Sequence, residues 1–221
     1  MSGPRVGEPP DCPLCGSGRT TRRLVREGTL YHGCPRCDLL FVDPSQLPSA
    51  EEERRRYESH RNVPTDPAYR RFLGRLAEPI LERVPQGAIG LDYGSGPGPT
   101  LSRILTEAGR PTRDYDPFFA PDVEALEHRY DFVTCSETAE HFHEPAGELR
   151  RIDELLHPGG WFGLMTGLVT KETDLASWWY LRDPTHVTFY SPATLDWIAE
   201  EYGWTLEPIS ATVALFRKDS D

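Results

Sequence analysis

The sequence predicts an α/β protein in which a Rossmann-like domain with a mostly parallel sheet and an antiparallel last strand follows a small N-terminal ribbon. Three observations carry this prediction. Short apolar runs alternate with helical runs from residue 88 onward, a glycine-rich turn joins one such strand to a helix at residues 94–98, and two Cys-x2-Cys pairs lie within the first 40 residues. Alternation of strands and helices is typical of parallel sheets covered by helices.

The ribbon is predicted from four of the five cysteines. Cys12 and Cys15 form one pair, Cys34 and Cys37 form the other, and eighteen residues separate the pairs. This spacing is typical of a zinc site with four thiolate ligands, which closes the coordination sphere and makes the metal structural. Disulfides are the alternative, although the pairing pattern and a reducing compartment disfavour them. Four cysteines suffice for the site, so His32 is expected on the surface.

Proline and charge dominate the stretch after the ribbon, and we predict a ribbon over residues 1–45, a linker over 46–66 and the main domain over 67–221. The segment AYRRFLGRLAEPILERV then places apolar residues at helical spacing, which predicts an amphipathic helix against the main domain. Cys135 lies alone in an apolar run and is expected to be a small buried side chain.

The main domain is predicted element by element from the runs that follow. Strands are expected in AIGLDY, PTRDYD, YDFVTCSE and WFGLMTG, and helices in TLSRILTEAG, AGELRRIDELLHPGG and SPATLDWIAEEYG. Ser191 and Pro192 start the last helix and Gly203 ends it. The runs TLEPIS and ATVALFRK, separated by a short turn, predict an antiparallel hairpin at one edge of the sheet.

Charge and hydropathy limit the partners. The formal net charge is −11, and residues 61–221 hold fifteen Lys or Arg against twenty-six Asp or Glu. Such an acidic domain repels phosphate backbones, so nucleic acid is not expected as a partner, and the basic residues Arg19, Arg22, Arg23 and Arg26 are expected to be solvated hairpin charges. No apolar run is long enough for a membrane span and none resembles a signal peptide, which predicts a cytoplasmic protein without a membrane partner.

The turn after the strand LDY suggests a ligand. Its glycines Gly94, Gly96 and Gly98 recur at every second position behind Asp92, which fits neither the G-x-G-x-x-G dinucleotide fingerprint nor a P-loop. Glycines allow close approach of the backbone to a ligand, and a preceding acid suits a ligand with an ammonium group. Ligands in open α/β sheets bind at the carboxyl ends of the strands, where this turn is expected.

With these motifs, the chain resembles the class I S-adenosylmethionine-dependent methyltransferases, in particular the zinc-ribbon-bearing branch of the ubiquinone-biosynthesis-like enzymes. YDFVTCSETAEHFHEP resembles that family's fourth-strand motif and LLHPGGWFGLMTG the segment before its fifth strand. The resemblance implies that S-adenosylmethionine is bound by Asp92, Tyr93, the three glycines, Asp116 and Ser136. Asp116 would bind the ribose hydroxyls, with Asp114 as the competing choice.

One departure from the family concerns the region between the second and fourth strands. Only fourteen residues separate Asp116 from Asp131, whereas a helix and a strand of a crossover unit need about twice that number. The third strand or its helix is therefore expected to be short or absent, and the way in which adenine is held is left open.

Candidate catalytic residues lie on two segments. His141 is the proposed general base, with Glu140 orienting the substrate or a ring nitrogen and His186 as a second base or hydrogen-bond donor. A structural cap for Glu140 and His141, and a buried turn network around His186, are the alternatives. Trp178, Trp179 and Tyr180 could cover the acceptor or pack in the core. Tyr57, His60 and Asn62 could close over the cofactor or belong to a plain linker.

The resulting hypothesis is an enzyme that transfers a methyl group to an O, N or C atom of a small-molecule acceptor. Two alternatives remain open at this point. The protein could methylate RNA bases and use the ribbon to bind RNA, which would make binding strongly salt-dependent. It could also be a non-catalytic ribbon module, in which case S-adenosylmethionine would not bind.

Overall fold

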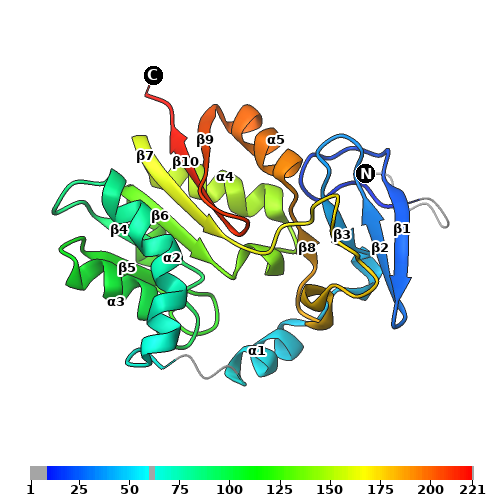
Figure 1. The fold of residues 1–221 in the computed structure, drawn as a ribbon, viewed down its shortest axis with the longest axis horizontal. Coiled ribbons are helices and arrows are strands. Elements are labelled where there is room, and N and C mark those ends of the chain that lie inside the picture. The colour runs from blue at the N-terminus through cyan, green and yellow to red at the C-terminus, as the bar shows by residue number, and fades with distance from the viewer. Residues whose placement is uncertain (1–8, 60–62, 221) are drawn as a thin grey trace.

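A computed structural model describes residues 9–59 and 63–220, and its centre is a six-stranded sheet (Figure 1). The strands lie in the order β5 (Thr112–Tyr115), β4 (Gly90–Tyr93), β6 (Tyr130–Ser136), β7 (Leu156–Met165), β10 (Val213–Lys218) and β9 (Trp204–Pro208). The first four are parallel, and β10 is antiparallel to both of its neighbours. The predicted fold class and the hairpin at the edge of the sheet are confirmed.

Helices cover both faces of this sheet, as expected for a parallel arrangement. On one face lie α2 (Pro67–Arg83) and α3 (Thr100–Glu107), whose buried residues join those of β10 in one core cluster. On the other lie α4 (Pro145–Leu155) and α5 (Pro192–Tyr202), which share a second cluster with Leu91 and Phe162. Gly203, in the left-handed conformation at φ +64°, ends α5 as predicted.

The shortened region is also confirmed. Between β5 and β6 the described residues form a tight loop, in which Asp116 and Ala120 exchange backbone hydrogen bonds, and the 3₁₀ helix η2 (Val123–Glu127). No strand lies beyond β5 in the described part of the sheet. β5 is therefore the outermost of the strands whose carboxyl ends could contact a ligand.

The N-terminal segment forms a second sheet that includes a strand from the main domain. Its order is β1 (Thr21–Arg26), β2 (Thr29–Gly33), β3 (Leu40–Val42) and β8 (Thr188–Phe189), all antiparallel. The β3–β8 pair joins residues about 150 positions apart in the chain, and Ser191 Oγ also donates to Asp38 Oδ2 at 2.7 Å. The domain boundaries at 45 and 66 remain a prediction, and the two parts share hydrogen bonds across them.

One expectation about the ribbon is wrong. His32 is buried with 1% of its surface exposed, stacks on Phe41 and pairs with Asp43 through an Nε2–Oδ2 distance of 2.8 Å. The ribbon is too small to place all its polar residues at the surface once it packs against the main domain. Cys135, by contrast, is fully buried as predicted.

Two segments connect the ribbon to α2. The 3₁₀ helix η1 (Pro44–Gln46) follows β3, and the helix α1 (Ala50–Glu58) begins at Ser49 with a capping box in which Ser49 and Glu52 bond reciprocally. Figure 1 shows α1 at one end of the molecule, below the sheet and the ribbon. The predicted linker is thus partly helical, and its helix lies over the site described next.

Candidate functional site

A cavity of about 780 Å³ opens at the carboxyl ends of β4, β5 and β6. Its walls come from the glycine turn, the loop after β5, the segment after β6, and residues of α1, α2 and the 3₁₀ helix η4 (Trp179–Arg182). Cavities of this size hold cofactors and small molecules, and the strand ends are where α/β sheets bind them. The described chain therefore places a ligand site where the sequence predicts one.

The glycine turn is held against the end of β6. Gly94 has φ +81°, and a Cβ atom at this position would lie 2.1 Å from Thr138 Cγ2. Thr138 Oγ1 donates to the carbonyl oxygens of Gly94 and Ser136, at 3.0 Å each. Gly94 and Gly96 line the cavity with Tyr93, whereas Gly98 is buried and does not. Thr138 was not predicted, because nothing in the sequence pairs a threonine with a glycine 44 residues earlier.

Asp116 connects the turn to the loop after β5. Its Oδ2 accepts from the Gly96 amide at 3.0 Å, and its Oδ1 accepts from the Phe118 and Phe119 amides at 2.8 and 3.0 Å. A carboxylate accepts about four hydrogen bonds, so one acceptor position remains for a ligand hydroxyl. Asp116 lines the cavity and Asp114 does not, which favours the predicted choice between them.

Asp92 lies beneath the turn rather than in the cavity wall. It is 3% exposed, and its Oδ1 accepts from Thr134 Oγ1 at 2.9 Å. Burial raises its pKa to about 7. The predicted direct contact with a ligand ammonium group is therefore not what this geometry provides, and Asp92 supports the turn from below.

The raised pKa of Asp92 has a consequence for stability. The folded protein holds this proton up to about pH 7, whereas the unfolded chain releases it near pH 4. The protonated Asp92 side chain therefore stabilises the folded protein fully below about pH 4, and this stabilisation is lost as the pH rises to 7. We expect Asp92→Asn, which keeps the hydrogen bond from Thr134, to gain on the order of 3 kcal/mol relative to wild type between these limits. Urea unfolding of both proteins at a series of pH values measures this gain. Free energies of unfolding that change with pH in parallel for the two proteins would contradict it.

Two hydroxyl groups of the cavity wall lack partners. Ser95 Oγ and Ser136 Oγ are buried and make no hydrogen bond within the described residues. Buried polar groups are nearly always bonded, so an unpartnered pair in a cavity wall fits a ligand that supplies the missing partners. Ser136, which was predicted as a cofactor contact, is thus among the residues that line the cavity, and its role stays a prediction.

Two histidines of the cavity lining have their tautomers set by backbone carbonyls. His141 Nδ1 lies 2.8 Å from the Thr185 carbonyl oxygen, and His186 Nδ1 lies 2.8 Å from that of Tyr180. A carbonyl oxygen only accepts, so each Nδ1 carries a proton and each neutral ring keeps Nε2 unprotonated. The centroids of the two rings are 4.8 Å apart. Burial lowers the pKa of His186. Both rings line the cavity as potential proton acceptors.

Glu140 is bound within a buried network behind these rings. It lies in the 3₁₀ helix η3 (Ala139–His141), is fully buried and accepts from Thr166 Oγ1 at 2.9 Å and Tyr180 OH at 2.5 Å. Its Oε1 is 4.0 Å from His186 Nε2. The His141 ring is oriented by the Thr185 carbonyl and not by Glu140, so this part of the prediction is corrected. Tyr180 and Thr166 have no local sequence motif that would have linked them to Glu140.

Residues of α1 and of the segment around η4 cover the two histidines. Arg56 pairs with Asp183 at 2.7 Å, and Glu53 accepts from His143 Nε2 at 3.1 Å. Although burial opposes it, hydrogen bonds from Arg56 and Thr185 hold the pKa of Asp183 well below its usual value. Asp183 and Thr185 thus form the turn network named as an alternative, and the network borders the cavity as well.

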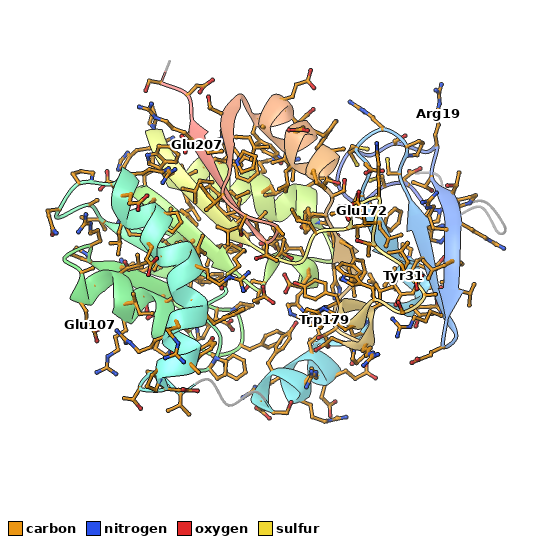
Figure 2. The ribbon with its side chains drawn as sticks, viewed as in Figure 1. Arg19, Tyr31, Glu107, Glu172, Trp179 and Glu207 are labelled. Carbon is orange, nitrogen blue, oxygen red and sulfur yellow. The ribbon has the colours of Figure 1, made fainter. Side chains whose placement is uncertain are left out.

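The aromatic residues that were predicted together have different positions. Tyr57 packs edge-on against His141 with ring centroids 5.0 Å apart. Trp179, labelled in Figure 2, is 64% exposed and lines the cavity, whereas the partly buried Trp178 packs against Phe189 of a core cluster. Of these two neighbours, Trp178 therefore packs against the core and Trp179 borders the cavity. His60 and Asn62 lie outside the described residues.

Negative charge predominates around this cavity. Arg56 and Arg151 are the only Lys or Arg side chains among the described lining residues, and both are paired, Arg151 with Glu148 at 3.6 Å. Seven carboxylates line the same cavity: Glu53, Asp116, Glu137, Glu140, Glu144, Glu148 and Asp183. An anionic group of a ligand would therefore have to compete with Asp183 or Glu148 for an arginine of this lining.

The four predicted cysteines converge in the ribbon. Cys12 and Cys37 have sulfurs 3.5 Å apart, Cys15 and Cys34 have sulfurs 3.4 Å apart, and all four sulfurs lie within 4.8 Å of one another. Thiolates bound tetrahedrally at a Zn–S distance of about 2.3 Å are roughly 3.7 Å apart, so the cluster has the dimensions of such a site. Four ligands leave no open coordination position for a substrate.

The strand order, the glycine turn at the end of β4 and the acid after β5 define the class I methyltransferase fold. A family model described as a methyltransferase domain matches residues 57–209. The chain belongs to this family. No helix among the described residues combines the length and apolarity that crossing a bilayer requires.

Individual relatives agree with this assignment. The ubiquinone biosynthesis O-methyltransferase of Leptothrix cholodnii is 32% identical over 94 residues, which are 42% of this chain and 40% of that protein. The enzyme of the same name from Nitrosospira multiformis is 35% identical over 92 residues, which are 40% of this chain and 36% of that protein. These matches span about two fifths of the relatives' length.

Solved structures show the same fold. The 1,6-didemethyltoxoflavin-N1-methyltransferase of Burkholderia thailandensis, bound to 1,6-didemethyltoxoflavin and S-adenosylhomocysteine, aligns with a TM-score of 0.55 and 17% identity over 90% of this chain and 99% of that one. A chain from the complex of the Haloferax volcanii Trm112 methyltransferase activator with a putative methyltransferase aligns with a TM-score of 0.56 and 15% identity, over 77% of this chain and 98% of that one.

Proposed function

We propose that this protein transfers a methyl group from S-adenosylmethionine to a small-molecule acceptor. The observation that carries the proposal is one cavity lined by two chemically different groups of residues. The glycine turn, Asp116 and two unpartnered serine hydroxyls form the first group, here called the cofactor end, and two histidines whose Nδ1 atoms are held by backbone carbonyls form the second. Family membership and the relatives' names support the same reaction.

The cofactor end is suited to a nucleoside with an amino acid attached. Gly94 and Gly96 would allow the ligand to approach the backbone, Asp116 would use its remaining acceptor position for a ribose hydroxyl, and Ser136 would donate to a polar group of the ligand. Phe118 and Phe119, which border the cavity after Asp116, offer aromatic surface for adenine in place of the shortened region. When bound, S-adenosylmethionine supplies a methyl group on a positively charged sulfur.

The chain's own contribution to the reaction is positioning and proton removal. Methyl transfer is an in-line displacement, so a cavity that aligns the acceptor and excludes water provides much of the rate. His141 Nε2 would accept the acceptor's proton, because the Thr185 carbonyl holds the Nδ1 proton and the residue lines the cavity. His186, neutral because burial lowers its pKa, would act as a second acceptor or hold the substrate.

A screen for release of S-adenosylhomocysteine tests this function. Purified protein with S-adenosylmethionine should release S-adenosylhomocysteine only when a suitable acceptor is added, with one methylated product per turnover. His141→Gln should lower kcat about 10²–10⁴-fold, the usual contribution of a general base, and leave the affinity for S-adenosylmethionine unchanged. His128→Gln, at a half-exposed position just after η2 and outside the cavity lining, is the control. A His141→Gln enzyme with the kcat of wild type would remove His141 from the mechanism.

We infer further that the four-cysteine cluster holds a structural Zn²⁺ ion and that the protein works in the cytoplasm. The cluster has the right ligands, number and spacing for zinc, and the thiols it needs persist in a reducing compartment. The acidic cavity also supports a small-molecule acceptor over RNA, whose phosphates it would repel.

A further inference from the structure

We propose that the methyl acceptor carries an amino group, protonated in solution, and that Glu137 is the carboxylate that binds it. This inference rests on the proposed function, since it concerns the acceptor half of the same cavity. It goes further by naming the chemical class of the acceptor and a specificity-determining residue that sequence reasoning did not select.

Glu137 is turned into the cavity by an unusual backbone conformation. It follows β6 with φ +48°, in the left-handed region that residues other than glycine rarely adopt. Neighbouring residues of a strand point to opposite faces, yet Ser136 and Glu137 both line the cavity. Its backbone amide donates to the Met165 carbonyl oxygen at 2.8 Å, which fixes the turn. Such strain is commonly retained where it positions a functional side chain.

The carboxylate of the partly buried Glu137 has no hydrogen-bond donor among the described residues, unlike three other acids of the cavity that are buried or partly buried. Glu140 accepts from Tyr180 and Thr166, Glu53 accepts from His143, and Asp183 is paired with Arg56. Glu144, the other lining acid without such a donor, is exposed. Glu137 is therefore the partly buried acid of the lining that remains available to a ligand.

The surroundings of Glu137 favour a cationic ligand. Burial and the neighbouring Glu140 raise its pKa to about 8, although Arg75 opposes this shift, so the protein compensates the charged carboxylate only in part. An ammonium group would supply that compensation and complete the missing hydrogen bond. A carboxylate or phosphate on the acceptor would instead meet seven acids and two arginines that are already paired.

Matched ligands that differ only in charge test the proposal. Protein saturated with S-adenosylhomocysteine would be titrated by calorimetry with tyramine, 4-hydroxyphenylethanol and 4-hydroxyphenylacetate, and with glucosamine, glucose and glucuronate as a second, non-aromatic set. We expect the ammonium member of at least one set to bind about tenfold or more tightly than its neutral member, and the carboxylate members not to bind, because a charge-assisted hydrogen bond contributes at least this factor.

Glu137→Gln then separates this residue from the rest of the cavity. The variant should lose the preference for the ammonium member while its affinity for S-adenosylhomocysteine stays within about threefold of wild type. Glu172→Gln, the same substitution on the exposed loop after β7 (Figure 2), should behave as wild type. Binding of the carboxylate members as tightly as the ammonium ones, no binding by either ammonium probe, or a preference that survives in Glu137→Gln would each overturn the proposal.

The first titration also distinguishes a failure of the proposed function from a failure of the proposed acceptor class. Failure of wild-type protein to bind S-adenosylhomocysteine would contradict the proposed function itself, and with it the acceptor class. Binding of S-adenosylhomocysteine without an ammonium preference would contradict the acceptor class alone.

Discussion

Replacing Gly94 by alanine should abolish measurable binding of S-adenosylmethionine and leave the protein folded. The new Cβ would lie 2.1 Å from Thr138 Cγ2, and the backbone at φ +81° is one that alanine adopts only with strain. Thr138 cannot move freely, because its hydroxyl bonds to the carbonyls of Gly94 and Ser136. The turn would therefore shift away from the end of β6, and we expect at least about a hundredfold loss of affinity by calorimetry.

Gly147→Ala is the matched control for this prediction. Gly147 lies in α4 with no atom within 4 Å of the position that its Cβ would occupy, so the same substitution should leave cofactor affinity unchanged. Circular dichroism should show equal helix and strand content in both variants. Wild-type affinity in Gly94→Ala would mean that the turn does not approach the ligand as closely as described.

Loss of the metal should have the largest effect on stability. Structural zinc contributes on the order of 10 kcal/mol to folding in isolated zinc-finger peptides, and a ribbon of this size has little core of its own. We expect Cys37→Ser, or extraction by a strong chelator, to lower the free energy of unfolding by at least about 3 kcal/mol. The effect should reach the catalytic end, because β3 of the ribbon pairs with β8, two residues beyond His186.

Three measurements check this expectation. Elemental analysis of wild-type protein should give one zinc per chain, denaturant unfolding should show the loss of stability, and restoring zinc to chelated wild type should recover it. Hydrogen exchange should increase in β8 as well as in β1 to β3 after chelation. A chelated protein with unchanged unfolding and exchange would show that the four cysteines do not hold a structural metal.

The sequence predicted those features that depend on local pattern. Strands and helices follow from hydrophobic periodicity, and Gly203 ends α5 because glycine adopts the left-handed conformation without strain. The spacing of the two cysteine pairs predicts that they meet in one site. The missing strand could be predicted as well, because fourteen residues cannot form both a helix and a strand.

Features that depend on distant partners could not be predicted. β8 is a strand of two residues that exists only because β3 lies beside it, and Thr138 matters only through its contact with Gly94. Asp92 is buried beneath the turn, where it bonds to Thr134 on the neighbouring strand, and His32 is buried within the ribbon against Phe41 and Asp43. Glu137 was overlooked for the same reason, since its turn into the cavity depends on a backbone angle that composition does not reveal.

The central claim is that the cavity over β4, β5 and β6 binds S-adenosylmethionine, and direct titration of the zinc-loaded protein tests it best. We expect one binding site per chain in the wild type and strongly weakened binding in Asp116→Ala, which removes the hydrogen bond from Gly96 and the proposed contact with ribose. No heat of binding to folded wild-type protein, or equal affinity in Asp116→Ala, would contradict the claim.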